Sequence, residues 1–159
     1  MISMIASVGR NMELGKNNNL IWHIPRDMKF FKETTMDHSV LMGWNTYKSL
    51  PGMLHGRDMI VLSLHHTDSN VKIVSSIEQI VDEFSDNSKE LFIIGGAKVY
   101  NEFFPYSSKL YLTEIDDTSD DADSFFPEFD KSLWNIEELY SNQYKNLNYK
   151  IRKYVRKVK

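Results

Sequence analysis

Asp27 has the clearest potential for acid–base chemistry. It lies two residues after Pro25, whose fixed φ angle suits the first turn of a helix, and Trp22, Met28 and Phe31 surround it in the sequence. A carboxylate among apolar side chains loses hydration, which raises its pKa and lets it exchange protons near neutral pH. A structural role stays open from position alone, because an acid in the first turn also complements the helix dipole.

Two glycine junctions could hold the phosphates of one elongated ligand. Gly95-Gly96 follows an apolar run and precedes an expected helix that carries Lys98, and Gly43 stands between a second strand and helix. Glycines let backbone N–H groups approach a phosphate closely, and the helix dipole favours the anion. The run from Gly95 to Tyr100 lacks the full G-x-G-x-x-G fingerprint of dinucleotide sites, so a plain tight turn is an equal alternative.

Other chemistries find little support in the sequence. Arg57 offers a planar fork for a carboxylate, although a surface cation is the simpler interpretation without further context. The five histidines match no metal-ligand spacing, and the nucleophile-elbow motif of serine hydrolases is missing. The chain has no cysteine, which excludes thiol nucleophiles, thiolate zinc sites and disulfides. We therefore expect no metal cofactor.

Length and charge narrow the class of protein. A chain of 159 residues suits a single domain, and its net charge of −3 argues against a general nucleic-acid-binding surface. No run of about 18 apolar residues occurs, and the first residues lack the basic region of a secretory signal. We expect a cytoplasmic, single-domain protein that binds neither nucleic acid nor membranes.

Charge is uneven along the second half of the chain. Residues 114–138 contain ten acids and one base, whereas residues 145–159 contain seven bases and no acid. These runs could form a metal site and an anion-binding tail. A solvated loop followed by a charged edge strand is the favoured interpretation, because lysines on edge strands commonly prevent aggregation.

Strand-like and helix-like segments alternate through the first two thirds of the chain. We expect strands at residues 2–8, 39–43, 59–63, 71–74, 91–94 and 110–115, helices at 25–34, 44–50, 76–84 and 97–104, and late strands at 134–140 and 149–158. This order is typical of an α/β fold with a mainly parallel central sheet of about eight strands, flanked by helices, and an antiparallel C-terminal edge. Ligands in such sheets bind beyond the carboxyl ends of the strands. Residues 10–21 are polar, and we expect a long loop there that closes over a ligand.

Several short motifs are informative through their order. They are Trp22-His23-Ile24-Pro25-x-Asp27-Met28-x-x-Phe31, Val40-x-Met42-Gly43-x-x-Thr46-Tyr47, Leu54-x-Gly56-Arg57, Ile94-Gly95-Gly96-Ala97-x-Val99-Tyr100, Leu110-Tyr111-Leu112-Thr113 and Asp123-Ser124-x-Phe126-Pro127. Each motif is ambiguous alone. In this order and at this spacing, the set resembles the dihydrofolate reductase family over nearly the whole chain.

The resemblance implies hydride transfer from NADPH to 7,8-dihydrofolate, which gives tetrahydrofolate for one-carbon metabolism. It implies a monomeric enzyme with one domain over residues 1–159, in which residues 38–88 approximately form an adenosine-binding lobe. The family is a target of diaminopyrimidine antifolates. A nucleotide-binding module without turnover and a reductase of pyrimidines are the alternatives. The retained Asp27 and Thr113 argue against the first, and Arg57 together with an apolar wall argues against the second.

The resemblance also implies roles for individual residues. Asp27 would bind the pterin 2-amino group and N3 and favour protonation of N5, directly or through a water near Trp22, while Thr113 would orient Asp27. Substrate contacts would come from Ile5, Met28, Phe31, Leu50, Leu54, Arg57, Ile94 and Tyr100, with Arg57 on the carboxylate of the glutamate tail. Cofactor contacts would come from Ala6, Ser7, Leu14, Gly15, Asn18, Gly43, Trp44, Asn45, Thr46, Leu62, Ser63, Leu64, Gly95, Gly96, Ala97, Lys98 and Val99.

Five positions depart from the family pattern, among them Asp37 in place of glycine or asparagine and Ile21 in place of proline. Trp44 replaces an arginine that helps to hold the adenosine end of the cofactor, Leu64 replaces a polar residue, and His55 replaces a proline. Loss of one charged phosphate contact costs about 1.5–3 kcal/mol, or roughly 10–150-fold in affinity. We expect a weaker preference for NADPH over NADH, with Trp44 stacking on adenine and His65 and Lys98 left as phosphate partners.

Overall fold

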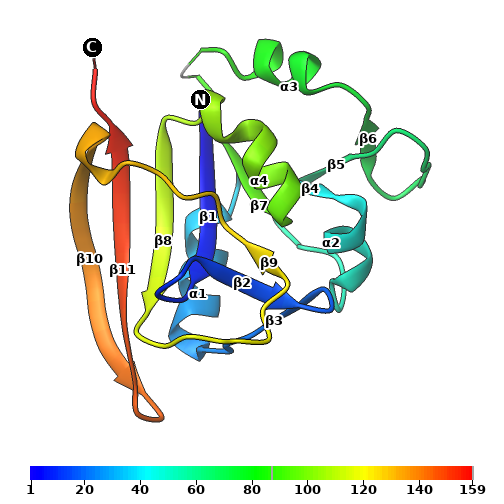
Figure 1. Cartoon of the computed structure of the whole chain (residues 1–159). Coiled ribbons are helices and arrows are strands. Elements are labelled where there is room, and N and C mark those ends of the chain that lie inside the picture. Colours follow the sequence, from blue (N-terminus) through cyan, green and yellow to red (C-terminus); the bar gives the residue numbers. More distant parts are fainter. Residues whose placement is uncertain (87, 159) are drawn as a thin grey trace.

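Parallel strands, each a short apolar run, form the centre of the molecule. The structure is a computed structural model that describes residues 1–86 and 88–158. The strands of its main sheet are β1 (Ile2–Val8), β4 (Ser39–Gly43), β5 (Asp58–Leu62), β6 (Lys72–Val74), β7 (Leu91–Gly95), β8 (Lys109–Ile115), β10 (Trp134–Tyr144) and β11 (Leu147–Arg156). They lie in the order β10-β11-β8-β1-β7-β4-β5-β6 (Figure 1). The six neighbouring strands β8-β1-β7-β4-β5-β6 are parallel, and β11 and β10 add an antiparallel edge. This arrangement confirms the predicted fold class.

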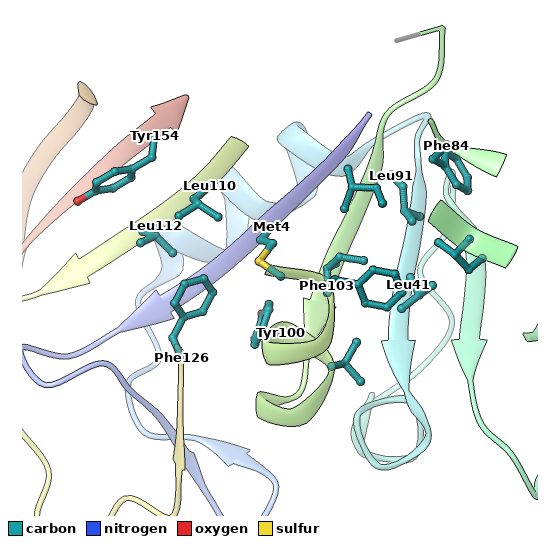
Figure 2. Close-up of a cluster of buried hydrophobic side chains, with 14 of the residues drawn as sticks. Met4, Leu41, Phe84, Leu91, Tyr100, Phe103, Leu110, Leu112, Phe126 and Tyr154 are labelled. Atoms are coloured by element: carbon teal, nitrogen blue, oxygen red, sulfur yellow. The ribbon is translucent and has the colours of Figure 1, made fainter. Parts of the chain in front are cut away.

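Helices cover both faces of this sheet, because parallel strands need crossover connections. They are α1 (Pro25–Thr35), α2 (Trp44–Ser49), α3 (Ile77–Glu83) and α4 (Ala97–Phe103), with short 3₁₀ turns η1 (Phe104–Tyr106) and η2 (Lys131–Leu133). Side chains alternate along β1. Met4 belongs to a buried cluster with Phe103 of α4 (Figure 2), whereas Ile5 belongs to a second cluster with Phe30 and Phe31 of α1. The two apolar clusters therefore fix the helices on opposite faces.

A hairpin occupies residues 13–20, so the prediction of a loop over residues 10–21 is wrong for that part. Here β2 (Glu13–Lys16) pairs with β3 (Asn19–Leu20) and with β9 (Ser124–Phe125), which makes a separate three-stranded sheet. Asn17 and Asn18 have φ angles of 50° and 63°, which suit a two-residue turn between antiparallel strands. Asparagines that suggest a loop are also among the residues that best tolerate this turn.

The antiparallel edge brings the acidic and basic runs together. On β11, Arg152 lies 3.3 Å from Glu114 of β8 and 4.0 Å from Glu138 of β10, and Lys150 lies 3.6 Å from Glu138. This pairing agrees with the favoured interpretation of charged strands at the sheet edge. In the described part of the chain, no group of three or more acidic or histidine side chains is arranged to hold a metal ion.

Among residues 1–86 and 88–158, no helix has both the length and the apolar character needed to cross a bilayer.

Glu13 ties the hairpin to the segment that follows β8. Its side chain is buried, and one carboxylate oxygen accepts a hydrogen bond from the backbone N–H of Asn11 at 2.8 Å. The other oxygen accepts from the backbone N–H of Ser119 at 2.7 Å. Because Ser119 lies between β8 and β9, this one carboxylate fixes two connections that flank the carboxyl end of β1.

Replacing Glu13 with alanine should lower the free energy of unfolding by about 2–6 kcal/mol, since each of the two backbone N–H groups left without an acceptor costs about 1–3 kcal/mol. Urea unfolding followed by circular dichroism measures the loss. Glu128→Ala, an exposed acid after β9, is the matched control and should change the value by less than about 0.5 kcal/mol. Equal losses in the two variants would contradict the role given to Glu13.

Candidate active site

Asp27 lies beside the carboxyl-terminal halves of β1 and β8. It occupies the first turn of α1, which begins at Pro25 as predicted. Ser7 of β1 and Thr113 of β8 are register partners on neighbouring parallel strands. The Ser7 hydroxyl donates a hydrogen bond to Oδ2 of Asp27, and the Thr113 hydroxyl donates to Oδ1. The sheet therefore holds both carboxylate oxygens, where the sequence had predicted only the contact with Thr113.

Burial changes the acid–base behaviour of this carboxylate. Loss of hydration raises the pKa of Asp27 above its ordinary value, and the hydrogen bonds from Ser7 and Thr113 offset only part of the increase. The direction agrees with the expectation from the sequence. A carboxyl group with a raised pKa can hold a proton closer to neutral pH than an exposed one.

Tyr100 closes the site from the side of α4. Its ring is buried, and its hydroxyl donates a hydrogen bond to the carbonyl oxygen of Ile5 at 2.7 Å. Burial and the negative charge of Asp27 raise the pKa of Tyr100, so the phenol stays neutral. The two predicted substrate contacts, Ile5 and Tyr100, are thus joined to each other next to the carboxylate.

Trp22 packs against the connection between β1 and β2. A Cβ atom added to Gly9 would lie 2.4 Å from Cη2 of Trp22, so only glycine fits beneath the indole ring. The indole Nε1 donates a hydrogen bond to Oδ2 of Asp117 at 3.0 Å. Asp117, which the sequence analysis did not single out, thereby anchors Trp22 to the segment after β8.

The two glycine junctions converge, as the sequence suggested. A Cβ atom added to Gly95 or Gly96 would lie 3.4 Å from Oγ1 of Thr46 on α2, and one added to Gly43 would lie 3.1 Å from Val99 on α4. Gly95 has a φ angle of 136°, which side chains rarely allow, and the Gly95–Gly96 peptide bond is cis. The amino-terminal ends of α2 and α4 therefore lie side by side, with bare backbone between them.

Trp44 has an aromatic partner that the sequence did not reveal. The rings of Trp44 and His66 stack with centroids 4.1 Å apart and planes 10° apart. Oγ of Ser63 lies 2.7 Å from Nδ1 of His66, and Nζ of Lys48 lies 5.4 Å from the centroid of the Trp44 ring. His66 is therefore the imidazole next to Trp44, and a pair of adjacent histidines gives no pattern that tells which ring stacks on the indole. The phosphate contact expected of His65 stays a prediction.

The other residues predicted to bind the cofactor differ in exposure. Leu64 is 75% exposed, and Lys98 is exposed with its Nζ 4.0 Å from a carboxylate oxygen of Glu102. Asn45 and Asn18 are exposed, the latter in the turn between β2 and β3, whereas Leu14 and Gly15 of β2 are buried; Ala6, Leu62 and Ala97 are half-buried. Side chains at the Trp44 end are therefore more accessible than those around Asp27.

Most of the predicted apolar wall is assembled. Phe31, Leu50, Leu54 and Ile94 pack around the same core cluster as Ile5. Met28 does not join them and is 61% exposed. Asp27 and Phe31, one helical turn apart, face the sheet, and Met28 points away from it, so its contact with the substrate stays a prediction.

Arg57 is held between two other segments. Its Nε donates to the carbonyl oxygen of His55 at 3.1 Å, and Nη1 donates to Oγ1 of Thr35 at 3.3 Å. Burial lowers the pKa of Arg57. A guanidinium has five N–H donors, so three stay available for a ligand. Leu54 and Arg57 also line a groove of about 690 Å³ near the amino ends of β4 and β5, to which Asp27 does not contribute.

Comparison with known proteins decides the family. The sequence pattern of dihydrofolate reductase matches residues 1–156. The chain belongs to the dihydrofolate reductase family. It is 40% identical over 139 residues to the dihydrofolate reductase of Bacillus subtilis, covering 86% of this chain and 81% of that protein. The enzyme of Neisseria gonorrhoeae is 36% identical over 140 residues, covering 86% and 85%.

A solved structure of the family has the same fold. Dihydrofolate reductase from Enterococcus faecalis, complexed with NADP(H) and RAB-propyl, matches with a TM-score of 0.86 at 29% identity, covering 98% of this chain and 96% of that one. The resemblance recognised from the motifs is therefore confirmed for both sequence and fold.

Asp27→Asn should make this dihydrofolate reductase family member more stable at neutral pH. Because the pKa of Asp27 is raised in the folded chain, the folded state binds a proton more readily than the unfolded state. Stability then falls as the pH rises above the ordinary value of 3.8, and asparagine removes this cost. Urea unfolding at pH 7 should give the variant the higher free energy of unfolding. The difference between the two proteins should narrow as the pH falls towards 3.8. A less stable variant at pH 7 would contradict a carboxylate destabilised by burial.

Proposed function

We propose that this chain reduces 7,8-dihydrofolate to 5,6,7,8-tetrahydrofolate with NADPH as the hydride donor. The observation that carries the proposal is Asp27, held through both oxygens by Ser7 and Thr113 next to the converging glycine junctions. This arrangement occurs in a chain whose family membership is established over residues 1–156.

Asp27 anchors the pterin ring. An ionised carboxylate accepts two parallel hydrogen bonds from neighbouring N–H groups, and the 2-amino group and N3 of a pterin supply such a pair. Burial strengthens these charge-assisted bonds and raises the pKa of Asp27, so the carboxyl group also favours a proton on the bound heterocycle at N5. Trp22, anchored by Asp117, limits the access of bulk water from one side.

The glycine junctions fit the dinucleotide. A Cβ atom at Gly95 or Gly96 would approach Thr46 to 3.4 Å, which shows that bare backbone lies between the starts of α2 and α4. Such backbone can donate N–H groups to phosphate oxygens. NADPH, when bound, supplies the hydride. Ala6, Ser7, Leu14, Gly15 and Asn18 are the residues of β1 and the hairpin that would hold its nicotinamide end.

The apolar wall and Arg57 suit the rest of the substrate. Phe31, Leu50 and Leu54 offer a surface for an aromatic spacer, and Ile94 faces it from the end of β7. Arg57 is oriented by His55 and Thr35 and keeps donors free for a carboxylate. The hairpin of β2 and β3 would act as the lid that excludes water during the reaction.

The organisation of the chain follows the same proposal. We infer a single monomeric domain over residues 1–159 that acts in the cytoplasm without nucleic-acid partners. Residues 38–88 approximately, which include β4, α2, β5, β6 and α3, would serve as the adenosine-binding lobe.

Loss of NADPH absorbance in the presence of dihydrofolate tests the function directly. The wild-type chain should turn over, and Asp27→Asn should lose at least about 100-fold in kcat at pH 7, because the group that favours the proton is gone. Activity of the variant should recover as the pH falls, since solvent protons then replace it. Asp82→Asn, an exposed acid on α3, is the control and should resemble wild type. No turnover by the wild-type chain at saturating cofactor would end the proposal.

Trp44→Arg should tighten NADPH binding by about 10-fold or more, because a guanidinium restores a charged contact to the phosphate on the adenosine ribose. Fluorescence titration with NADPH gives the Kd, and NADH, which lacks that phosphate, is the internal control. The Kd for NADH should stay within about threefold of wild type or rise, because the stack of Trp44 on His66 is lost. An unchanged Kd for NADPH would contradict this account of Trp44.

A further inference from the structure

Ser7 shares the carboxylate of Asp27 with Thr113. It lies opposite Thr113 in the register of β1 and β8, and the two hydroxyls bind different oxygens of Asp27. Each carboxylate oxygen therefore accepts a hydrogen bond from one hydroxyl of the sheet.

These two hydrogen bonds leave part of the acceptor capacity of Asp27 available to a ligand. A carboxylate has about four acceptor positions on its two oxygens. Ser7 and Thr113 occupy one position on each oxygen, and one position on each stays available for a pair of N–H donors. The torsion that turns a carboxylate is otherwise soft, so a single donor would leave the plane of the group less well defined.

We propose that Ser7 is a positioning residue of the reaction: its hydroxyl, together with that of Thr113, sets the plane of Asp27 and favours its ionised form. The proposal rests on the proposed function, in which the remaining two acceptor positions receive the pterin. Ser7 acts through Asp27 and need not touch the substrate.

The phenols and the guanidinium near Asp27 do not take the place of the two hydroxyls in stabilising the ionised carboxylate. Tyr100 on α4 and Tyr149 on β11 are phenols near enough to feel its charge, and the pKa of each is raised, so both are neutral. Arg26, the preceding residue of α1, instead places its guanidinium 4.9 Å from the ring centroid of Tyr140. Hydrogen bonds to the charged form from Ser7 and Thr113 therefore oppose the desolvation of Asp27.

Titration of the Asp27 carboxyl carbon by ¹³C NMR tests the idea in the ligand-free protein. Ser7→Ala and Ser7→Val remove the hydroxyl, and the Asp27 midpoint should move to higher pH in both. Ser7→Thr has nearly the shape of valine but keeps the hydroxyl, so its midpoint should stay at the wild-type pH. Ser3→Ala is the matched control, because Ser3 lies on the same face of β1 and its buried hydroxyl donates to Glu90 at 2.6 Å.

Turnover gives the second measurement. The kcat/KM for dihydrofolate should fall by about 10-fold in the alanine and valine variants and recover with threonine, whereas Ser3→Ala should stay near wild type. The proposal is overturned if the Asp27 midpoint is unchanged in Ser7→Ala and Ser7→Val. It is also overturned if the midpoint in Ser7→Thr shifts as far as in those two variants. If wild type does not reduce dihydrofolate, the proposed function fails, but the NMR comparison still decides whether Ser7 governs Asp27.

Discussion

A single carboxylate held partly out of water is the constraint on which the rest of the site depends. Without donors, Asp27 at the sheet would be costly to ionise, because burial raises its pKa. The donors come from neighbouring parallel strands, whose spacing of about 4.8 Å is fixed by backbone hydrogen bonds. A shift of β1 by one residue would turn Ser7 to the opposite face, so its hydrogen bond to Asp27 depends on the register of the sheet.

The strand order places the glycine junctions next to this carboxylate. The chain passes from β1 to β4 and leaves between them the position that β7 later fills. At such a reversal of strand order, the loops that leave neighbouring strands separate and make room for a ligand. The helices α1, α2 and α4 each start close to the carboxyl ends of these strands (Figure 1). Asp27, Thr46 and Gly95-Gly96, which lie at the starts of these helices, therefore share one edge of the sheet.

The sequence predicted the structure correctly where a residue type allows few backbone conformations. The helix after Pro25, the buried run before Gly95-Gly96 and the antiparallel edge follow from periodicity and backbone restrictions, and the structure agrees. It was insufficient where a contact depends on three-dimensional register. Ser7 looks like any small residue in a strand until β8 places Thr113 opposite it, and the stack of His66 on Trp44 has no counterpart in spacing or hydropathy.

The two ends of the site differ in how strongly the fold restricts their residues. Around Asp27, a change removes a partner from a group that is difficult to hydrate, so stability and chemistry change together. At the Trp44 end, side chains such as Leu64 are exposed, and a replacement there costs little in stability. The departures from the family pattern at Trp44 and Leu64 lie at this accessible end, whereas Asp27, Trp22 and Thr113 are retained. Residues at the Trp44 end can therefore change without disturbing the hydrogen bonds that hold the Asp27 carboxylate.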